Sequence, residues 1–236
     1  MYGSFGSRRR CSTPSFYAEQ YNNSLLRFIG EMVENNLRGR GRPRAFDANV
    51  ALDSAAELFW THGYSATSLD ELSAAMAMGR PSIYNAFGDK QELFLRVLER
   101  FRDTTASAPL RVLEREELVG PAVDAFFEEV VAYTTADRGH RGCLLGSVAI
   151  SSDLPAVQRF LRTNIRATET QIAKRLAAAV AAGQLPADYS AEAGARRMVN
   201  SMLALGTRAR LGTSRRELLA DAAQTADAVL GRGDRP

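Results

Sequence analysis

TSLDELSAAMAMGRPSIYNAFGDKQELF, residues 67–94, is the stretch that decides the fold. Ser68 followed three residues later by Glu71 is a capping box, in which a hydroxyl and a carboxylate bind free amides at a helix start. The apolar residues that follow are spaced as one stripe of a helix, and the sequence AMG then interrupts that spacing. Pro81 suits the start of a new helix, because its missing N–H would be unpaired there anyway. The stretch therefore predicts two short helices joined by a tight turn, with Asp89 capping a third.

A helix, a sharp turn and a second helix of about two turns form a helix-turn-helix, whose second helix enters the DNA major groove. Ile83 and Phe87 are four residues apart and share the face expected to pack inward. Arg80, Ser82 and Asn85 are left to point elsewhere. A small helical core with an exposed polar face is the alternative interpretation, and the residue types favour DNA recognition.

The segments GYSATSLDELSAAM (63–76) and RPSIYNAFGDKQELF (80–94) closely resemble the DNA-binding domain of the TetR family of bacterial repressors. The shared features are a Thr-Ser entry, an apolar-Tyr-x-x-Phe recognition helix and a lysine a few residues later. The resemblance covers residues 44–102 and is weaker beyond them. One position departs from the family pattern, because the usual turn glycine is Ala77 here and Gly79 stands two residues on. Alanine at a left-handed position costs on the order of 1 kcal/mol or more, so we expect a slightly different turn.

The residues that open the second helix are candidates for reading bases. Arg80 can bind guanine O6 and N7 together, and Asn85 can bind adenine in the same two-point manner. Ser82 is compatible with several bases, and Pro81 offers apolar contact to a thymine methyl group.

Phosphate contacts are predicted around these base readers. Thr67 and Ser68 lie at a helix N-terminus, where hydroxyls and free amides meet phosphate. Tyr84 resembles the family's phosphate-binding tyrosine, and half-buried packing is a compatible alternative role. Lys90, one of only two lysines in the chain, resembles the family's phosphate-clamping lysine. Residues 45–90 hold six acids against two cations, a net charge of −4, so we expect the acids to point away from DNA.

The N-terminal segment is basic. Residues 1–44 hold eight arginines against three glutamates, a net charge of +5, whereas the whole chain carries +3. A basic arm before a helix-turn-helix is a recurrent means of reaching phosphates or the minor groove. We assign that role to Arg40, Arg42 and Arg44, with a solvated tail as the alternative. A change in composition near Met32 suggests the hypothesis that this residue is the native start.

Composition excludes several classes of protein. The chain has 236 residues, of which 45% are hydrophobic and 24% charged, as in an ordinary globular protein. No apolar run is long enough for a membrane span. The basic residues near the start are not followed by the apolar stretch typical of a secretory signal. Cys11 and Cys143 form no disulfide framework, which favours the cytoplasm. The absence of zinc, phosphate-loop and dinucleotide motifs leads us to expect no metal and no cofactor.

The apolar spacing along the chain predicts an all-α fold, with an N-terminal three-helix head and a larger helical body. We expect a disordered basic arm at 1–43, a TetR-type DNA-binding domain at 44–104 with its motif at 68–87, and a ligand-binding and dimerisation domain at 105–236. Within the body, RGCLLGSVA (141–149) and the segment from residue 181 to residue 218 also resemble the family.

The resemblance implies that the last two helices pair with those of a second copy as a four-helix bundle. Small and apolar residues allow this contact, and burial within one subunit is the alternative. The residues expected to face the partner are Ala195, Met198, Val199, Met202, Leu203, Gly206, Ala209, Leu218, Ala222, Ala226 and Val229.

A mainly apolar pocket is expected between the helices predicted at 121–135, 155–183 and 191–211, with a few polar groups to orient a ligand. The same apolar residues would also describe any helical core. The predicted lining is Phe127, Val131, Tyr133, Cys143, Phe160, Asn164, Thr168, Met198 and Met202.

Together these features predict a homodimeric transcriptional repressor that binds a double-stranded DNA operator and is released from it by an unidentified small-molecule effector. Two alternatives remain open. One is an enzyme built on the helical body with Cys143 and His140 as a reactive pair. The other is an architectural DNA-binding protein without an effector.

Overall fold

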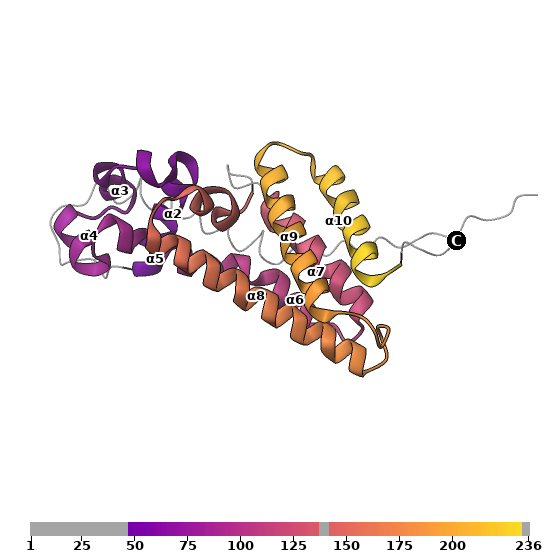
Figure 1. Ribbon diagram of the computed structural model, residues 1–236. Coiled ribbons are helices and arrows are strands. Elements are labelled where there is room, and N and C mark those ends of the chain that lie inside the picture. The colour runs from indigo at the N-terminus through magenta and orange to yellow at the C-terminus, as the bar shows by residue number, and fades with distance from the viewer. Residues whose placement is uncertain (1–46, 137–141, 233–236) are drawn as a thin grey trace, which may run out of the picture. The chain divides into compact units, whose positions relative to one another are not determined.

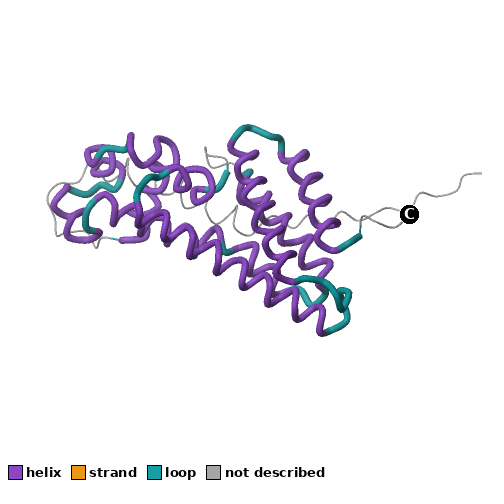
Figure 2. Tube along the Cα trace, viewed as in Figure 1, coloured by secondary structure: helices purple, strands orange, loops and turns teal. Residues whose placement is uncertain are grey.

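The computed structural model describes residues 47–136 and 142–232. Regular structure in these two ranges is helical throughout, without a strand (Figures 1 and 2). The all-α prediction is therefore confirmed. Arg40, Arg42, Arg44 and His140 lie outside the described residues, as does the arm predicted at 1–43. No helix in the described ranges has both the length and the apolar character needed to cross a bilayer.

Four helices form what we call the head: α2 (Ala48–Ala66), α3 (Leu69–Ala75), α4 (Arg80–Phe87) and α5 (Lys90–Phe101). Side chains cap three of their starts. The Asp47 carboxylate accepts a hydrogen bond from the Asn49 amide at 2.9 Å. Both predicted capping boxes are present, Ser68 with Glu71 and Asp89 with Glu92. Local side-chain chemistry thus sets where three of these helices begin.

The turn between α3 and α4 is a Schellman motif with alanine in the glycine position. Ala77 has φ of +50°. Its N–H donates to the Ala74 carbonyl at 3.2 Å, and the Met78 N–H donates to the Ser73 carbonyl at 3.0 Å. These two bonds close the end of α3. Gly79 has an ordinary extended conformation as the N-cap of α4, so the left-handed position falls on Ala77.

The head packs around aromatic side chains from its first and last helices. The Phe59 and Phe94 ring centroids lie 4.7 Å apart, and those of Tyr64 and Phe94 lie 5.1 Å apart. Gly63 has φ of +78°, and one further turn follows it before α2 ends. This break lets Tyr64 pack back on Phe94. Ile83 and Phe87 of α4 are buried, as predicted.

Five further helices form what we call the body: α6 (Ala108–Arg115), α7 (Val119–Thr134), α8 (Pro155–Ala181), α9 (Ala191–Arg210) and α10 (Arg215–Leu230). A π-helical turn, η1 (Arg102–Ala106), connects α5 to α6. The apolar segment after the 137–141 gap forms η2 (Leu144–Val148) and η3 (Ala149–Ser151).

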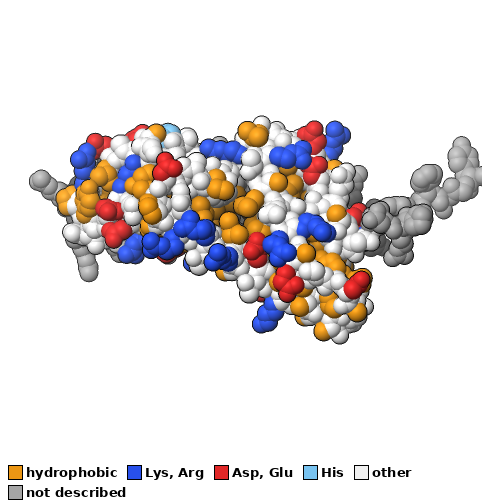
Figure 3. Space-filling model, in the orientation of Figure 1, with side chains coloured by type: hydrophobic (Ala, Val, Ile, Leu, Met, Phe, Trp, Pro, Cys, Tyr) orange, Lys and Arg blue, Asp and Glu red, His pale blue; other side chains and the backbone are white. Residues whose placement is uncertain are grey.

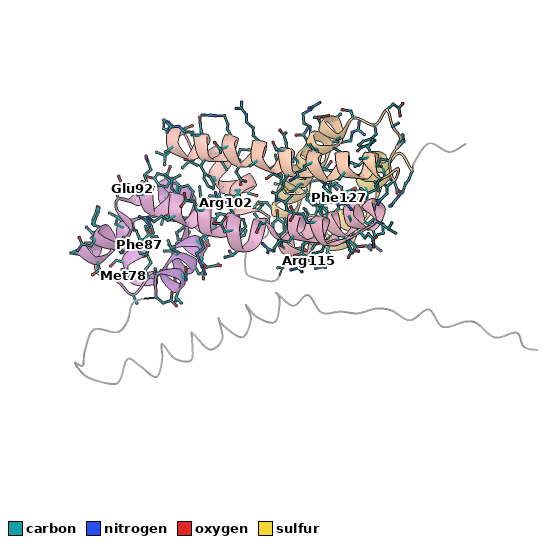
Figure 4. The ribbon with its side chains drawn as sticks, turned by 90° about the horizontal axis from the view of Figure 1, so that it is seen from below. Met78, Phe87, Glu92, Arg102, Arg115 and Phe127 are labelled. Atoms are coloured by element: carbon teal, nitrogen blue, oxygen red, sulfur yellow. The ribbon has the colours of Figure 1, made fainter. Side chains whose placement is uncertain are left out.

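Helices of the body pack both on chain neighbours and on helices farther along the chain. Helix α8 lies along α9, while α7 packs against α6, α9 and α10 (Figure 1). The apolar stripe of α7 is fully buried, with Phe126 and Phe127 in edge-to-face contact at 5.2 Å between centroids. Figure 4 marks Phe127 among the body helices.

The face of α9 and α10 that was expected to meet a second copy is largely buried inside this chain. Met198, Val199 and Ala222 are at most 2% exposed. Met202 and Leu203 line an internal cavity. The predicted dimer face is therefore wrong, because α7 and α8 already cover the apolar stripes. Burial within one subunit is the correct alternative for these residues.

Head and body are in direct contact within the unit formed by residues 46–236. Arg210 of α9 donates from Nη2 to the carbonyl oxygen of Trp60 in α2 at 3.1 Å. Just after α5, the Arg102 guanidinium lies 5.4 Å from the centre of the Phe160 ring of α8; Arg102 is labelled in Figure 4. The boundary predicted between residues 104 and 105 stays a prediction.

Candidate functional site

Helix α4 presents its polar side chains outward and its apolar ones inward. Ile83 and Phe87 are buried, which fixes the rotation of the helix on the head. The five predicted contact residues on this helix are all exposed, and Tyr84 is 48% exposed. They are Arg80, Pro81, Ser82, Tyr84 and Asn85. A two-turn helix with this exposed face has the size and polarity of a major-groove reader.

Arg80, the first residue of α4, is held by an acid from the preceding helix. Its Nε donates to Asp70 Oδ1 at 2.9 Å, and its Nη2 donates to the same oxygen. The arginine lowers the pKa of the Asp70 carboxyl, first through the hydrogen bond and then through its charge. The base reader predicted from sequence is therefore a paired side chain, and its partner was not predicted.

The two residues predicted to bind phosphate ahead of α3 differ in exposure. Thr67 is 1% exposed, and its hydroxyl donates to the Gly63 carbonyl at 2.7 Å. The proposed hydroxyl contact to phosphate is therefore wrong for Thr67, because that group closes the kink of α2 instead. Ser68 is exposed and accepts from the Glu71 amide at 3.2 Å. The Ser68 hydroxyl also bonds the Glu71 carboxylate, which lowers the pKa of that acid, so a phosphate contact by Ser68 stays a prediction.

Lys90 lies at the start of α5 with its ammonium over an aromatic ring. The Nζ atom is 4.5 Å from the centre of the Tyr64 ring. Partial burial lowers the pKa of Lys90, and the nearby Glu71 carboxylate opposes that shift. Burial raises the pKa of the Tyr64 hydroxyl, and the charge of the nearby Asp89 carboxylate raises it further. The ring therefore restricts the lysine that the sequence assigned to phosphate.

The acids of the head are engaged locally. Asp47 and Asp89 cap helices, and Glu71 completes the capping box of α3. Asp53 binds Arg100 through both carboxylate oxygens, at 2.6 and 2.7 Å. These carboxylates are thus held at helix starts or by an arginine, and the expectation that the acids point away from DNA stays a prediction.

A cavity of about 720 Å³ lies in the body, with part of its wall supplied by the end of the head. Apolar side chains gather between α8 and α9 on the face seen in Figure 3. Residues from α5, η1, α6, α7, η2, η3, α8 and α9 contribute to the lining. This volume falls in the range of small-molecule sites.

Six of the nine predicted lining residues meet in this cavity: Tyr133, Cys143, Phe160, Asn164, Thr168 and Met202. Phe127, Val131 and Met198 are buried but do not line it. Those three assignments are wrong. Their side chains project from α7 and α9 into the core, and Phe126 takes the lining position expected of its neighbour.

Tyr133 and Cys143 form the polar floor of the cavity. The tyrosine hydroxyl and the cysteine thiol are hydrogen-bonded. Burial raises the pKa of Tyr133 well above its usual value, with a further contribution from Cys143. Burial also raises the pKa of the Cys143 thiol. Both groups are therefore neutral near neutral pH and offer a ligand hydrogen bonds without charge.

Several residues of the cavity escaped the sequence prediction. Arg102 and Asp103, from η1, are hydrogen-bonded to each other at 2.6 Å and lie on the lining with Arg159 of α8. The sequence offered no signal for these charges, since each occurs in an ordinary charged helix. Only the packing of α5 and η1 against α8 brings them together.

Comparison with known proteins identifies the family of both the head and the body. Residues 51–97 match the family described as "Bacterial regulatory proteins, tetR family", and residues 120–226 match "Tetracyclin repressor-like, C-terminal domain". The HTH-type transcriptional repressor BdcR of Escherichia coli (strain K12) is 30% identical over 199 residues, covering 84% of this chain and 96% of BdcR. The HTH-type transcriptional repressor ComR of the same organism is 32% identical over 152 residues, covering 63% of this chain and 72% of ComR.

A solved structure gives the same result in three dimensions. The TetR family transcriptional regulator CifR, in a complex with 26-bp double-strand operator DNA, has a TM-score of 0.73 and 32% sequence identity, covering 79% of this chain and 99% of CifR. The helix-turn-helix and the helical body coincide with the two matched regions of the family. The chain is a DNA-binding transcriptional regulator that belongs to the TetR family.

Proposed function

We propose that this protein is a homodimeric repressor that binds a double-stranded DNA operator and leaves it when a small molecule occupies the body cavity. The observation that carries the proposal is the exposed polar face of α4, held on a buried apolar face. The relatives ComR and BdcR are repressors, and CifR binds operator DNA, which supports repression as the outcome of binding.

DNA contact is assigned to side chains in two roles. Arg80 and Asn85 suit two-point contacts to base edges, and Ser82 and Pro81 adjust which bases fit. Ser68, Tyr84 and Lys90 suit phosphate oxygens, as do Arg40, Arg42 and Arg44 of the arm.

The dimer is proposed to form through the outward face of α9 and α10. This face carries Ser201, Ala204, Gln224 and Ala228 beside a shallow groove of about 380 Å³. Small side chains permit close helix approach, and the Arg208–Asp221 ion pair joins the two helices along it. Two-fold symmetry would place two α4 helices on half-sites about 34–36 Å apart, one turn of DNA.

The cavity is suited to control DNA binding by the head, because α5 of the head and helices of the body both line it. Leu95 of α5 and Arg102 of η1 line it together with Cys143. A Cβ at Gly206 would lie 3.3 Å from the Cys143 Cβ, so α9 fits closely against that loop. One turn further along α9, Arg210 binds the Trp60 carbonyl of the head. A ligand that changes this packing changes DNA affinity by its preference between the two arrangements.

The enzyme alternative has little support. A nucleophilic cysteine needs a lowered pKa, and burial moves the pKa of Cys143 in the opposite direction. Relatives that regulate transcription favour a non-enzymatic role. A bacterial regulator of transcription acts at the chromosome, which supports a cytoplasmic location.

The proposal is tested by selecting bound sequences from a random pool of double-stranded DNA, followed by footprinting. Enrichment of one palindromic sequence, which we then call the operator, is the expected result. Recovery of unrelated sequences with equal affinity would contradict sequence-specific binding and favour the architectural alternative.

Effector control is tested separately by titrating candidate apolar ligands with and without the operator. An effector should bind less tightly in the presence of operator by the same factor that it weakens operator binding. Equal affinities in the two titrations would exclude that compound. Failure across a broad apolar library would favour a regulator without an effector.

A further inference from the structure

The Asp70–Arg80 pair lies on the surface proposed to meet DNA, where a carboxylate is out of place. Asp70 stands in the first turn of α3 and Arg80 opens α4. Their side chains are 75% and 54% exposed. A free carboxylate beside a phosphate backbone would weaken binding by charge repulsion. An exposed ion pair also stabilises a fold only slightly. An acid in the first turn of α3 suits the helix dipole, but that role does not require contact with Arg80, and DNA affinity does not account for the contact.

The geometry of the pair accounts for it. A guanidinium has five N–H donors on two usable edges. Asp70 Oδ1 accepts from Nε and from Nη2 of Arg80, which occupies the side edge. One N–H of Nη1 and the second N–H of Nη2 remain on the end edge. That end edge is the one needed to bind guanine O6 and N7 together.

We propose that Asp70 is a positioning residue for base recognition, which orients the end edge of the Arg80 guanidinium toward a guanine in the major groove. The inference rests on the proposed function, because it assigns Arg80 to base reading. Arginine has several rotatable bonds, and fixing one edge reduces the freedom lost when the other edge binds. Asp70 then contributes to selectivity while it lowers affinity for DNA in general.

The experiment compares Asp70→Ala, Asp70→Asn, Arg80→Ala and the Asp70→Ala/Arg80→Ala double variant. For each, the dissociation constants for the operator enriched by the wild-type protein and for random duplex DNA are measured at one salt concentration. Operators altered at each base pair in turn locate the position that Arg80 reads. Thermal unfolding of every variant verifies that the head is folded.

In Asp70→Ala, random-DNA affinity should rise, because one negative charge is removed. The ratio of operator affinity to random-DNA affinity should fall about threefold or more, the coupling expected within one hydrogen-bonded network. The loss of preference should fall on the same base pair that Arg80→Ala relaxes. Asp70→Asn should retain part of the preference, since its amide oxygen can still accept from Nε. In the Arg80→Ala background, removing Asp70 should leave the ratio unchanged.

Three results would overturn the inference. If Asp70→Ala strengthens binding to operator and random DNA by the same factor, Asp70 acts only through its charge. If the ratio rises, Asp70 sequesters Arg80 rather than orienting it. If the ratio falls equally with and without Arg80, Asp70 acts through another contact. A wild-type protein that enriches no sequence would instead overturn the proposed function, and the positioning role with it.

Discussion

Replacing Ala77 by glycine should stabilise the protein, although glycine usually destabilises ordered structure. Ala77 occupies the left-handed position of the Schellman motif that ends α3, with φ of +50°. Its side chain is exposed, so a change to glycine removes little buried surface. Ala77→Gly should therefore change the free energy of unfolding only through the backbone conformation of the folded and unfolded states.

The magnitude follows from two opposing contributions. Relief of the left-handed strain on alanine is worth about 1–2 kcal/mol. The greater freedom of glycine in the unfolded chain opposes it by about 0.4–1 kcal/mol. The net gain in the free energy of unfolding spans about 0–1.6 kcal/mol and centres on about 0.8 kcal/mol. For a chain of this length that corresponds to a melting temperature raised by about 1–4 °C.

The chain provides a matched control at the end of α8. Gly183 has φ of +71° in the same motif, with the Gly183 and Gln184 amides bound to Val180 and Ala179. A Cβ there would meet no atom within 4 Å, so Gly183→Ala changes only conformation. It should lower the melting temperature by a similar amount. Calorimetric or circular-dichroism melts of both variants check the pair, and destabilisation by Ala77→Gly would refute the strain argument.

Further outcomes are expected at other sites. Lys90→Ala should weaken binding to operator and random DNA alike and reduce the slope of log K against log salt by about one unit, measured by titration at several salt concentrations. Ala204→Arg should yield monomers in sedimentation, whereas Ala178→Arg on the exposed side of α8 should not, and a dimer in both would move the interface elsewhere. Cys143 of the folded protein should react with iodoacetamide far more slowly than in urea at about pH 8, since burial raises the pKa of its thiol; peptide mass spectrometry isolates its signal. Arg210→Ala should reduce the factor by which an effector weakens operator binding, and an unchanged factor would exclude that contact from the coupling.

Much of the fold could be predicted from sequence because it depends on interactions between near neighbours. The capping boxes at Ser68 and Asp89 act over three residues, and both are present as predicted. The tight turn was predicted from a helix end and a helix start only a few residues apart, but the expected change in its build was wrong, since Ala77 itself takes the left-handed position. The exposed face of α4 follows in the same way from Ile83 and Phe87, which share one side of a short helix. Motif recognition then added the family.

The tertiary structure alone decided which helix covers each apolar face and which distant side chains meet. The apolar stripe of α9 is visible in the sequence, but its periodicity does not state whether a second chain or α8 covers it. Phe126 and Phe127 are equally apolar neighbours, and only the rotation of α7 sends the first to the cavity. The Arg210–Trp60 bond joins residues 150 positions apart. Sequence spacing constrains contacts within an element, whereas contacts between elements depend on how the packed helices are rotated and placed, which no local pattern encodes.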